Sequence, residues 1–561
     1  MRRINLADIK DEVFDIIIIG AGVTGSAIAR DASLRGLKTI VIEKDDIAAG
    51  TSSKSSKLIH GGLRYLETLQ FGLVAESVKE RELALKMAPH LTKVESFMYM
   101  FYDGYPEKKW QMNLGLSFYD FVSGAWRSRR HKMLSTADVI AMQPQFNQNG
   151  LNGAALFYDV STDDARITID TMKSACEHGA GLINHCRVTD LVFNDSRCTG
   201  VMVKDEISKT EGVVLGRYVV NSTGPWSDSI MQMEKKSADM LKPTKGVHIV
   251  LDKKDFPLNS AVFMRSPDDG RVVWPVPSVE GDRVYIGTTD TTFEGAINDV
   301  YPERQDVQYL LNVANSLMPQ AKLTFEHVVG SWAGLRPLIA PTGNVSNSKI
   351  PREHQIVFGE SGLISIIGGK LTSHRIMAKH VLDALIKKDN GQYFKSKSLP
   401  YNYTSFPISG GADKSGGKFN YDYITNKLLK NGVPQDIAKR WASRYGTNAI
   451  KIMEHWSLGE KYKKVLSKRH MTIAEVHYCV KDESAISIQD LMIRRTSVFF
   501  WESDGGLSYV NTVATEMKSI LDWSDEEFKV QIENYKSLVK KHRWESKSMV
   551  RVNLQPTGHF S

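Results

Sequence analysis

The chain has 561 residues, of which 42% are hydrophobic and 24% are charged, so it belongs neither to the disordered nor to the collagen-like class. At roughly 150 residues per domain, this length predicts about three or four structural units. The formal net charge of +8 does not require a nucleic-acid partner, and it suits an anionic substrate or an anionic membrane face.

The first elements predicted along the chain form a βαβ unit. Residues 14–19 are an apolar, β-branched run typical of a buried parallel strand. A helix is expected over residues 23–35, where Gly36 ends it, and residues 39–42 are a second buried strand. Such a unit at the start of a chain indicates a dinucleotide-binding fold.

The turn between the first strand and the helix reads Gly-Ala-Gly-Val-Thr-Gly over residues 20–25 and matches the G-x-G-x-x-G motif in its required context. Gly20 allows the tight turn, Gly22 lets the backbone approach a pyrophosphate, and Gly25 lets helix and strand pack closely. The helix N-terminus offers N–H groups and positive potential to the phosphates. Glu43 ends the second strand and is expected to accept hydrogen bonds from the adenosine ribose.

Three features favour FAD over NAD as the bound dinucleotide. Residues 51–62 form a loop of small hydroxyl residues and glycines that can wrap an extended, buried cofactor. Residues 221–226 follow a predicted strand, as a crossover that contacts the cofactor would. Residues 368–372 lie between a strand and a helix, whose N-terminus could stabilise the negative charge of reduced flavin. A second complete G-x-G-x-x-G motif does not occur, which argues against a built-in NAD(P)H site.

The residues predicted to bind FAD, held non-covalently, come from these segments and from one position of the strand-rich middle; no metal site is predicted. They are Gly20, Gly22, Val23, Thr24, Gly25, Glu43, Lys44, Thr51, Ser52, Ser53, Ser56, Lys57, Leu58, Ile59, His60, Gly61, Gly62, Val188, Ser222, Thr223, Gly224, Trp226, Gly369, Lys370, Leu371 and Thr372.

The later elements complete an α/β prediction: an FAD-binding dinucleotide (Rossmann-like) fold with an interleaved mixed-sheet substrate domain and an all-helical C-terminal domain. Strands are expected over 187–193, 198–204, 212–221, 247–251, 261–264, 271–276, 283–288 and 362–367, and helices over 371–386 and from about 420 to 543. The expected boundaries are 1–400 for the interleaved body (FAD part mainly 12–75, 155–240 and 330–390; substrate part mainly 76–154 and 241–329), 401–417 for a linker, 418–545 for the helical domain and 546–561 for a tail.

A series of longer motifs resembles the FAD-dependent glycerol-3-phosphate dehydrogenases. They are TSSKSSKLIHGGLRYLE at 51–67, VSTDDAR at 160–166, NSTGPWSD from 221, KGVHIV at 245–250, IGTTD at 286–290, AGLRPL at 333–338 and GGKLT from 368. The likeness runs in order from about residue 15 to the mid-370s, and more weakly through the helical domain around His477 and residues 490–496. One departure follows GGKLT: Ser373-His374-Arg375 stands where the family often has Thr-Tyr-Arg.

The resemblance implies oxidation of sn-glycerol 3-phosphate to dihydroxyacetone phosphate, with two electrons passing to FAD and then to membrane quinone. A sister subfamily passes them to oxygen and makes hydrogen peroxide, but it carries an insertion that this chain does not show. Other amine or hydroxy-acid oxidases share the flavin fold and remain rivals. A flavin-dependent RNA-modifying protein and a non-enzymatic flavin-binding module are the alternatives from other classes.

Six residues map by resemblance onto the family's substrate pocket: Arg64, Tyr65, His248, Arg336, Arg352 and Lys370. The arginine and lysine side chains suit the binding of a phosphate. His248 is the candidate base, since an imidazole titrates near neutral pH, while Arg336 and Lys370 would stabilise the reacting oxygen. From the residues alone, a structural histidine on a strand is the competing interpretation of His248.

Residues 108–132 place apolar and aromatic side chains between lysines and arginines, which suits a helix lying in the interface of an anionic bilayer; a core-packing helix with a basic end is the alternative. No apolar run is long enough to span a bilayer, and four cysteines without a C-x-x-C pair favour a reducing compartment. We therefore expect a cytoplasmic protein attached peripherally to the inner face of the cell membrane. The oligomeric state is open, a homodimer being one option, and the helical domain could cover the site or dimerise.

Overall fold

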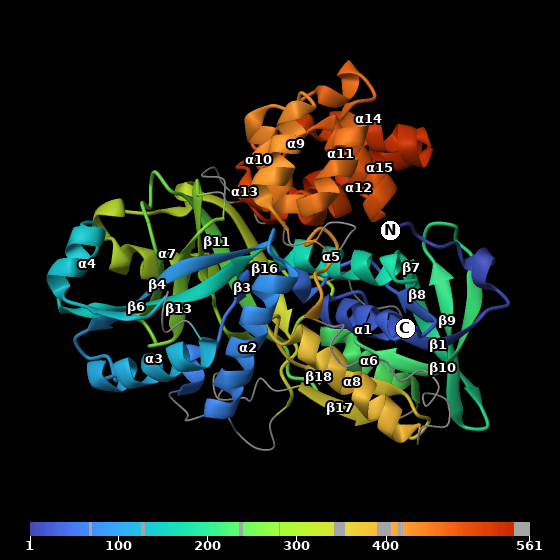
Figure 1. Ribbon diagram of the computed structural model, residues 1–561, viewed down its shortest axis with the longest axis horizontal. Coiled ribbons are helices and arrows are strands. Elements are labelled where there is room, and N and C mark those ends of the chain that lie inside the picture. The colour runs from blue at the N-terminus through green and yellow to red at the C-terminus, as the bar shows by residue number, and fades with distance from the viewer. Residues whose placement is uncertain are drawn as a thin grey trace, which may run out of the picture.

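The computed structural model describes residues 1–66, 70–124, 129–234, 239–279, 281–340, 354–389, 405–412, 417 and 419–543. Two sheets lie side by side, and a helical domain formed by the C-terminal part of the chain lies across their junction (Figure 1). This arrangement is the predicted combination of a dinucleotide-binding fold, a mixed-sheet domain and a helical C-terminal domain.

The first sheet has eight strands with a parallel centre, and the apolar run at the start of the chain is its middle strand. Its order is β17 (His354–Phe358), β18 (Ile364–Gly368), β10 (Glu211–Asn221), β1 (Val13–Ile19), β2 (Thr39–Ile42) and β7 (Gly181–Ile183), and β9 (Arg197–Asp205) joins β10 to β8 (Cys186–Asn194). Helices α1 (Val23–Leu34), α5 (Asp164–Glu177) and α8 (His374–Lys388) pack on it, so residues 16–19 are almost completely buried.

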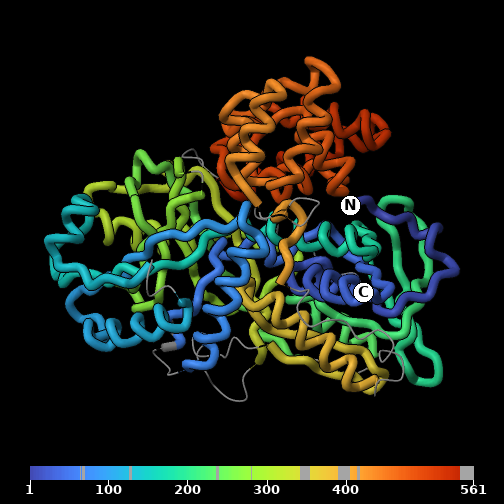
Figure 2. The backbone as a smooth tube through the Cα atoms, in the orientation of Figure 1, coloured from blue at the N-terminus to red at the C-terminus, as the bar shows by residue number. Residues whose placement is uncertain are grey.

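Three distant parts of the chain build the centre of this sheet. In parallel register, Ile19 pairs with Asn221, and Asn221 pairs with Ser365. Figure 2 shows the blue N-terminal tube and the yellow segment that holds α8 running next to each other. The cofactor fold is therefore interrupted by the residues of the second sheet, as the sequence predicts.

The second sheet has ten strands and curves around a separate core. Its order is β15 (Thr291–Thr292), β11 (Thr244–Asp252), β14 (Arg283–Gly287), β13 (Val272–Pro277), β12 (Ala261–Arg265), β4 (Thr92–Tyr102), β6 (Leu151–Thr162) and β3 (Leu58–Ile59), with β16 (Val328–Arg336) on β11 and β5 (Lys132–Leu134) on β6. Strands β3 and β16 belong here although their residues fall inside ranges expected for the FAD part, because β3 pairs with β6 and β16 with β11. Helices α2 (Phe71–Met87), α3 (Lys109–Ser123), α4 (Thr136–Met142) and α7 (Arg304–Leu317) surround this sheet, and α6 (Ser227–Met231) follows β10.

The C-terminal domain is helical throughout its described residues, as predicted. Its helices are α9 (Tyr421–Lys430), α10 (Gln435–Tyr445), α11 (Ala449–Trp456), α12 (Ile473–Glu483), a π-helical turn (Asp490–Arg495), α13 (Val498–Trp501), α14 (Val510–Leu521) and α15 (Asp525–Lys541). Their apolar faces share one core with part of the second sheet, so the domain is packed against the body and not merely tethered to it.

A buried network of ion pairs joins the helical domain to the first sheet. Arg166 on α5 donates to both carboxylate oxygens of Glu483 at 2.6 and 2.8 Å. Arg495 binds Asp46 at 2.7 and 2.9 Å, and Arg494 binds the same carboxylate at 2.6 Å. Each of these side chains is less than a tenth exposed, so the pairs fix the two parts of the molecule in one relative position.

Candidate functional site

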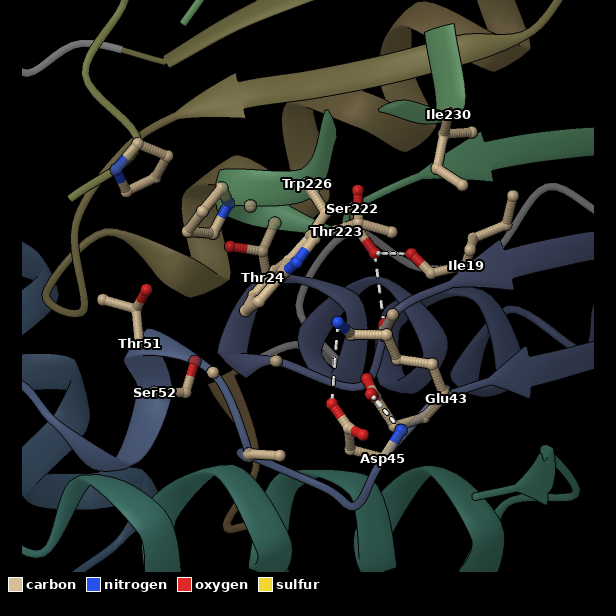
Figure 3. A pocket seen from close by; sticks show the side chains of 18 of the residues that line it. Ile19, Thr24, Glu43, Asp45, Thr51, Ser52, Ser222, Thr223, Trp226 and Ile230 are labelled. Atoms are coloured by element: carbon tan, nitrogen blue, oxygen red, sulfur yellow. Dashed lines mark hydrogen bonds and ion pairs between the residues drawn. The ribbon is translucent and has the colours of Figure 1, made fainter. Parts of the chain in front are cut away.

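A cavity of about 690 Å³ opens at the carboxyl ends of the parallel strands, which is where ligands bind in open α/β sheets. Its volume lies within the range of about 300–1,000 Å³ typical of ligand sites. Predicted cofactor residues in its lining are Gly20, Gly22, Val23, Thr24, Glu43, Lys44, Thr51, Ser52, Val188, Ser222, Thr223, Gly224, Trp226, Gly369, Lys370 and Leu371. Figure 3 shows side chains from β1, β2, the 51–52 turn and the end of β10 converging on this space.

The glycine turn has the geometry that a bound diphosphate requires. Gly20 has φ +100°, and a Cβ on Gly25 would lie 1.9 Å from the carbonyl oxygen of Gly20, so neither position tolerates a side chain. Gly22 is the N-cap of α1 and offers no side chain to satisfy the first-turn amides, although Val23 N–H donates to Ser52 Oγ at 2.9 Å. The positive end of α1 therefore faces the cavity through bare backbone.

Glu43 lies at the end of β2 with its carboxylate held by two backbone amides. Ala21 N–H donates to Oε2 at 2.7 Å and Asp45 N–H donates to Oε1 at 2.9 Å. Burial raises the pKa of Glu43 to about 7, and the two backbone hydrogen bonds offset only part of this increase. A carboxylate in this position can accept further hydrogen bonds from ribose hydroxyls, which would favour its charged form.

Lys44, Trp226 and Asn298 meet at one side of the cavity. Lys44 Nζ lies 4.0 Å from the centre of the Trp226 ring, and both Lys44 Nζ and Trp226 Nε1 donate to Asn298 Oδ1 at 2.8 Å. Asn298 and Asp45 also line the cavity and were not predicted, because no motif includes them. The bare glycine turn, the Glu43 carboxylate at the end of β2 and the volume together fit an extended dinucleotide such as FAD.

Ten predicted cofactor residues do not line this cavity. They are Gly25, Ser53, Ser56, Lys57, Leu58, Ile59, His60, Gly61, Gly62 and Thr372. The Lys57 side chain instead makes a buried ion pair of 2.5 Å with Asp164, and residues 58–59 pair with β6. The backbone N–H of Gly61 donates to Tyr119 Oη at 2.9 Å and to Asp159 Oδ1 at 3.2 Å. From Lys57 to Gly61 the loop is therefore held by α5, β6 and α3 and does not line this cavity.

His248 lies on β11, is 3% exposed and does not itself line the cavity, although Ser55, next to its partner Ser56, does. Its Nε2 lies 3.0 Å from Ser56 Oγ, and its Nδ1 is buried without a hydrogen-bond partner among the described residues. Burial, followed by the nearby charges of Arg336 and Lys57, lowers its pKa well below 6.5. The imidazole is therefore neutral at physiological pH and can accept a proton.

Arg336 lies close enough to His248 to lower its pKa, and Lys370 lines the cavity itself. Arg336 donates to Asp290 Oδ1 at 3.0 Å and to Thr288 Oγ1 at 2.8 Å, which orients its guanidinium. It directly precedes Pro337, a lining residue. Lys370 lines the cavity and holds its Nζ 4.1 Å from the centre of the Tyr65 ring.

Two predicted substrate residues receive no side-chain description. Arg352 lies outside the described residues, and Arg64 lies in a short helical turn over Leu63–Leu66 in which only its backbone is described. His374 stands where the family often has a tyrosine. Its ring is buried on α8, and Nδ1 contacts the carbonyl oxygen of Leu371 at 2.7 Å. The ring thus binds the backbone of the turn that precedes α8, and burial lowers its pKa to about 4.

One grouping among the described residues has the spacing of a metal site: Asp46, His185 and Asp490. Both carboxylates already bind buried guanidinium groups, Arg494 bridging them at 2.6 and 2.5 Å. The group is therefore explained as part of the ion-pair network between the domains.

The chain matches two family models. The model described as FAD dependent oxidoreductase covers residues 15–375, and the model described as C-terminal domain of alpha-glycerophosphate oxidase covers residues 404–528. The aerobic glycerol-3-phosphate dehydrogenase of Bacillus subtilis (strain 168) is 35% identical over 544 residues, covering 95% of this chain and 96% of that protein. A protein of the same name from Staphylococcus aureus (strain USA300) is 35% identical over 543 residues, covering 95% of each.

Solved structures show the same similarity. The glycerol-3-phosphate dehydrogenase of Bacillus halodurans, complexed with FAD, has a TM-score of 0.80 at 28% identity and covers 97% of this chain and 98% of its own. The L-alpha-glycerophosphate oxidase of Mycoplasma pneumoniae, with FAD bound, has a TM-score of 0.52 at 18% identity and covers 67% of this chain and 95% of its own. At that lower identity the second structure supports the fold alone.

Proposed function

Because the chain belongs to the FAD-dependent oxidoreductase family, in the group of the aerobic glycerol-3-phosphate dehydrogenases, we propose that it oxidises sn-glycerol 3-phosphate to dihydroxyacetone phosphate with FAD as cofactor. The observation that carries this proposal is the set of groups in and beside the cavity. Lys370 lines the cavity, Arg336 directly precedes the lining residue Pro337, and buried His248 lies close enough to Arg336 for that charge to lower its pKa. Cations that can bind a phosphate and an uncharged imidazole are what the oxidation of a phosphorylated secondary alcohol requires.

Oxidation at C2 breaks the C2–H and O–H bonds and forms a C=O bond. The C2 hydrogen leaves with two electrons, and bound FAD supplies the group that accepts them. His248 accepts the hydroxyl proton, for which its low pKa leaves it unprotonated. Arg336 and Lys370 stabilise the negative charge that develops on the oxygen and bind the phosphate, together with Tyr65 and, by resemblance, Arg64 and Arg352.

FAD would be held by the residues that line the cavity. The amides at the start of α1 would bind the diphosphate, Glu43 would accept hydrogen bonds from the ribose, and the residues of the Gly369 turn, which line the cavity before α8, would stabilise reduced flavin. No covalent link to the cofactor is proposed.

The test is the visible spectrum of the FAD-loaded protein under anaerobic conditions. Glycerol 3-phosphate should bleach the flavin, and a D-amino acid should not. The opposite result would assign the chain to the amine oxidases that share this fold. His248→Ala should slow the bleaching by about 100-fold or more, as expected for the loss of a general base. An undiminished rate would remove His248 from this role.

We propose further that α3 attaches the protein to an anionic membrane surface. Trp110, Leu114 and Phe121 are 63%, 66% and 76% exposed, whereas Met112 and Leu116 on the opposite face are buried in the core. Among the described residues, no helix is long and apolar enough to cross a bilayer. A half-buried helix with exposed aromatic side chains suits attachment in the plane of the interface.

Cationic side chains flank this apolar face. Lys108, Lys109 and Arg130 are exposed and Arg129 is partly exposed, while Trp126 and Arg127 of the predicted segment lie outside the described residues. Replacing Arg129 and Arg130 by Glu should release the protein from vesicles of anionic phospholipid but not change anaerobic bleaching. Binding that persists would contradict this surface.

Membrane quinone is the proposed electron acceptor. The proposed attachment through α3 supports it, because quinone dissolves in the membrane. Reoxidation of the reduced protein should be fast with a soluble quinone analogue and slow with oxygen. Rapid oxygen consumption with hydrogen peroxide as product would instead assign an oxidase.

A further inference from the structure

The surroundings of His248 extend into the C-terminal domain. Across the second sheet, His248 on β11 pairs with Gly287 on β14 at one side and with Trp332 on β16 at the other. The imidazole and the Trp332 ring are stacked, with centroids 4.8 Å apart and planes 12° apart. A Cβ on Gly287 would lie 2.0 Å from His248 Cδ2, so the absence of a side chain there leaves the space that the imidazole occupies.

Trp332 is itself fixed from two directions. Its Nε1–H donates to the carbonyl oxygen of Ser55 at 3.1 Å, which joins it to the loop beside the cavity. On its other side lies α13 of the helical domain: Phe500 and Trp501 meet the Trp332 ring edge-on at 5.4 and 6.0 Å between centroids. The contact is close, because a Cβ on Gly330 of the same strand would lie 2.5 Å from the carbonyl oxygen of Phe500.

The same aromatic cluster holds a cation near the imidazole. Lys57 Nζ lies 5.3 Å from the centre of the Trp332 ring and 5.1 Å from that of Phe500. The titratable groups that face the imidazole from the loop and the neighbouring strands are Lys57, Tyr285 and Arg336; Asp164 and Asp290 are the partners of Lys57 and Arg336. No carboxylate among the described residues contacts His248 directly, so the environment favours the neutral ring.

We propose that Trp332, supported by Phe500 and Trp501 of the C-terminal domain, is a positioning residue that keeps the catalytic imidazole oriented and shielded from water. On this proposal the helical domain does more than cover the active site, because its side chains hold Trp332 against His248. This inference rests on the proposed role of His248 as the base. It assigns a task in the reaction to Phe500 and Trp501, which no motif of the sequence indicates.

Phe500→Leu tests the proposal, and Phe499→Leu is the matched control. Phe499 is the adjacent residue of α13 and equally buried. Its ring contacts Tyr535, His542 and the Phe500 ring, but it makes no ring contact with Trp332, so it reaches the stack only through Phe500. Both changes remove one buried aromatic ring from the same helix, so both should destabilise the domain by a similar amount. Only Phe500→Leu should loosen the stack and admit water to His248.

The first readout is the pH dependence of anaerobic flavin reduction. In the native protein the rate should stay constant down to well below pH 6.5, since His248 is neutral there. Suppose that Phe500→Leu returns the pKa of His248 to its ordinary value of about 6.5. About a quarter of the molecules then carry a neutral imidazole at about pH 6, so the rate of flavin reduction falls about four-fold more than it does at about pH 8. Phe499→Leu should leave the acid limb unchanged. An equal loss at every pH in Phe500→Leu would overturn the proposal.

A second readout needs no turnover. In histidine-labelled protein, the imidazole resonance that disappears in His248→Ala belongs to His248, and its titration midpoint should rise in Phe500→Leu but not in Phe499→Leu. Trp332→Phe should keep the native titration midpoint of His248, because it keeps a ring for the imidazole to stack on, whereas Trp332→Leu should raise it. This pair of variants tests the positioning role if Phe500→Leu does not fold. An unmoved midpoint in Trp332→Leu would refute the positioning role. The proposed role of His248 as the base is tested separately, because an unaltered rate of flavin reduction in His248→Ala would refute that role.

Discussion

Glu43 predicts that FAD binding is linked to proton release. In the protein without cofactor, burial raises the pKa of this carboxyl from its reference of 4.5 to about 7. Hydrogen bonds from the ribose hydroxyls would stabilise the charged form and lower the pKa again. The carboxylate therefore binds FAD better than the carboxylic acid does, and affinity should rise as the pH rises through about 7.

The magnitude follows from the two pKa values. If bound FAD returned the pKa of Glu43 to 4.5, the affinity would increase by about 30-fold between about pH 5.5 and about pH 8.5. The stability of the protein without FAD should change in the opposite sense. Because the folded pKa is raised, the contribution of Glu43 is fully present below 4.5 and is lost as the pH rises through about 7, a difference on the order of 3 kcal/mol.

FAD titrations followed by calorimetry give both the affinity and the protons released, when repeated in buffers of different ionisation enthalpy. Glu43→Gln should remove the pH dependence and the proton release. Asp45→Asn is the control, since it deletes a carboxylate two residues away that also lines the cavity but is 56% exposed. An unchanged pH slope in Glu43→Gln, or its loss in Asp45→Asn, would refute the reasoning.

Three other predictions concern the substrate end, the domain junction and α3. Arg336→Ala should lower kcat/KM by an amount equivalent to about 2–4 kcal/mol by removing a charge-assisted contact to the phosphate, with Arg336→Lys intermediate; an unchanged kcat/KM would contradict the assignment. Asp46→Asn should lower the free energy of unfolding by about 3–5 kcal/mol in urea titrations, because it leaves buried Arg495 without its carboxylate; a loss below about 1 kcal/mol would show that the pair is compensated. Trp110→Asp with Phe121→Asp should abolish vesicle binding in sedimentation assays while thermal stability stays within a few degrees, since both side chains are exposed; retained binding would exclude this face.

Local patterns were sufficient for the dinucleotide half of the molecule. Strands β1 and β2 and helix α1 occur where the apolar runs and the glycine turn predict them, because the sequence signals of each element lie within a few residues of one another. The same holds for β8, β9 and β10, although β4 and β6 were expected only as part of an unspecified sheet.

Orientation within loops and helices could not be predicted. Lys57 lies in a motif rich in cofactor-type residues, yet its side chain binds Asp164, which is 107 residues away in the sequence. On α3 both faces carry apolar side chains, and only packing decides that Leu116 is buried while Leu114 is exposed. No sequence pattern indicates that Phe500 lies near His248. The two are connected only through Trp332, which pairs with His248 in the sheet and contacts Phe500 across the domain junction.

The strand order of the first sheet has a consequence for biosynthesis. Ile19 acquires its neighbour Asn221 only after about 200 further residues, and Asn221 acquires Ser365 about 140 residues later. At about 5–20 residues per second, the ribosome therefore takes about 20–70 s from the synthesis of β1 to the synthesis of β18, before which the sheet cannot be complete. The nascent chain cannot build the cofactor cavity before β18 and the turn that follows it emerge. FAD can therefore bind only when most of the chain has been synthesised. In flavin-starved cells the full-length chain should be made without FAD and then degraded by proteases.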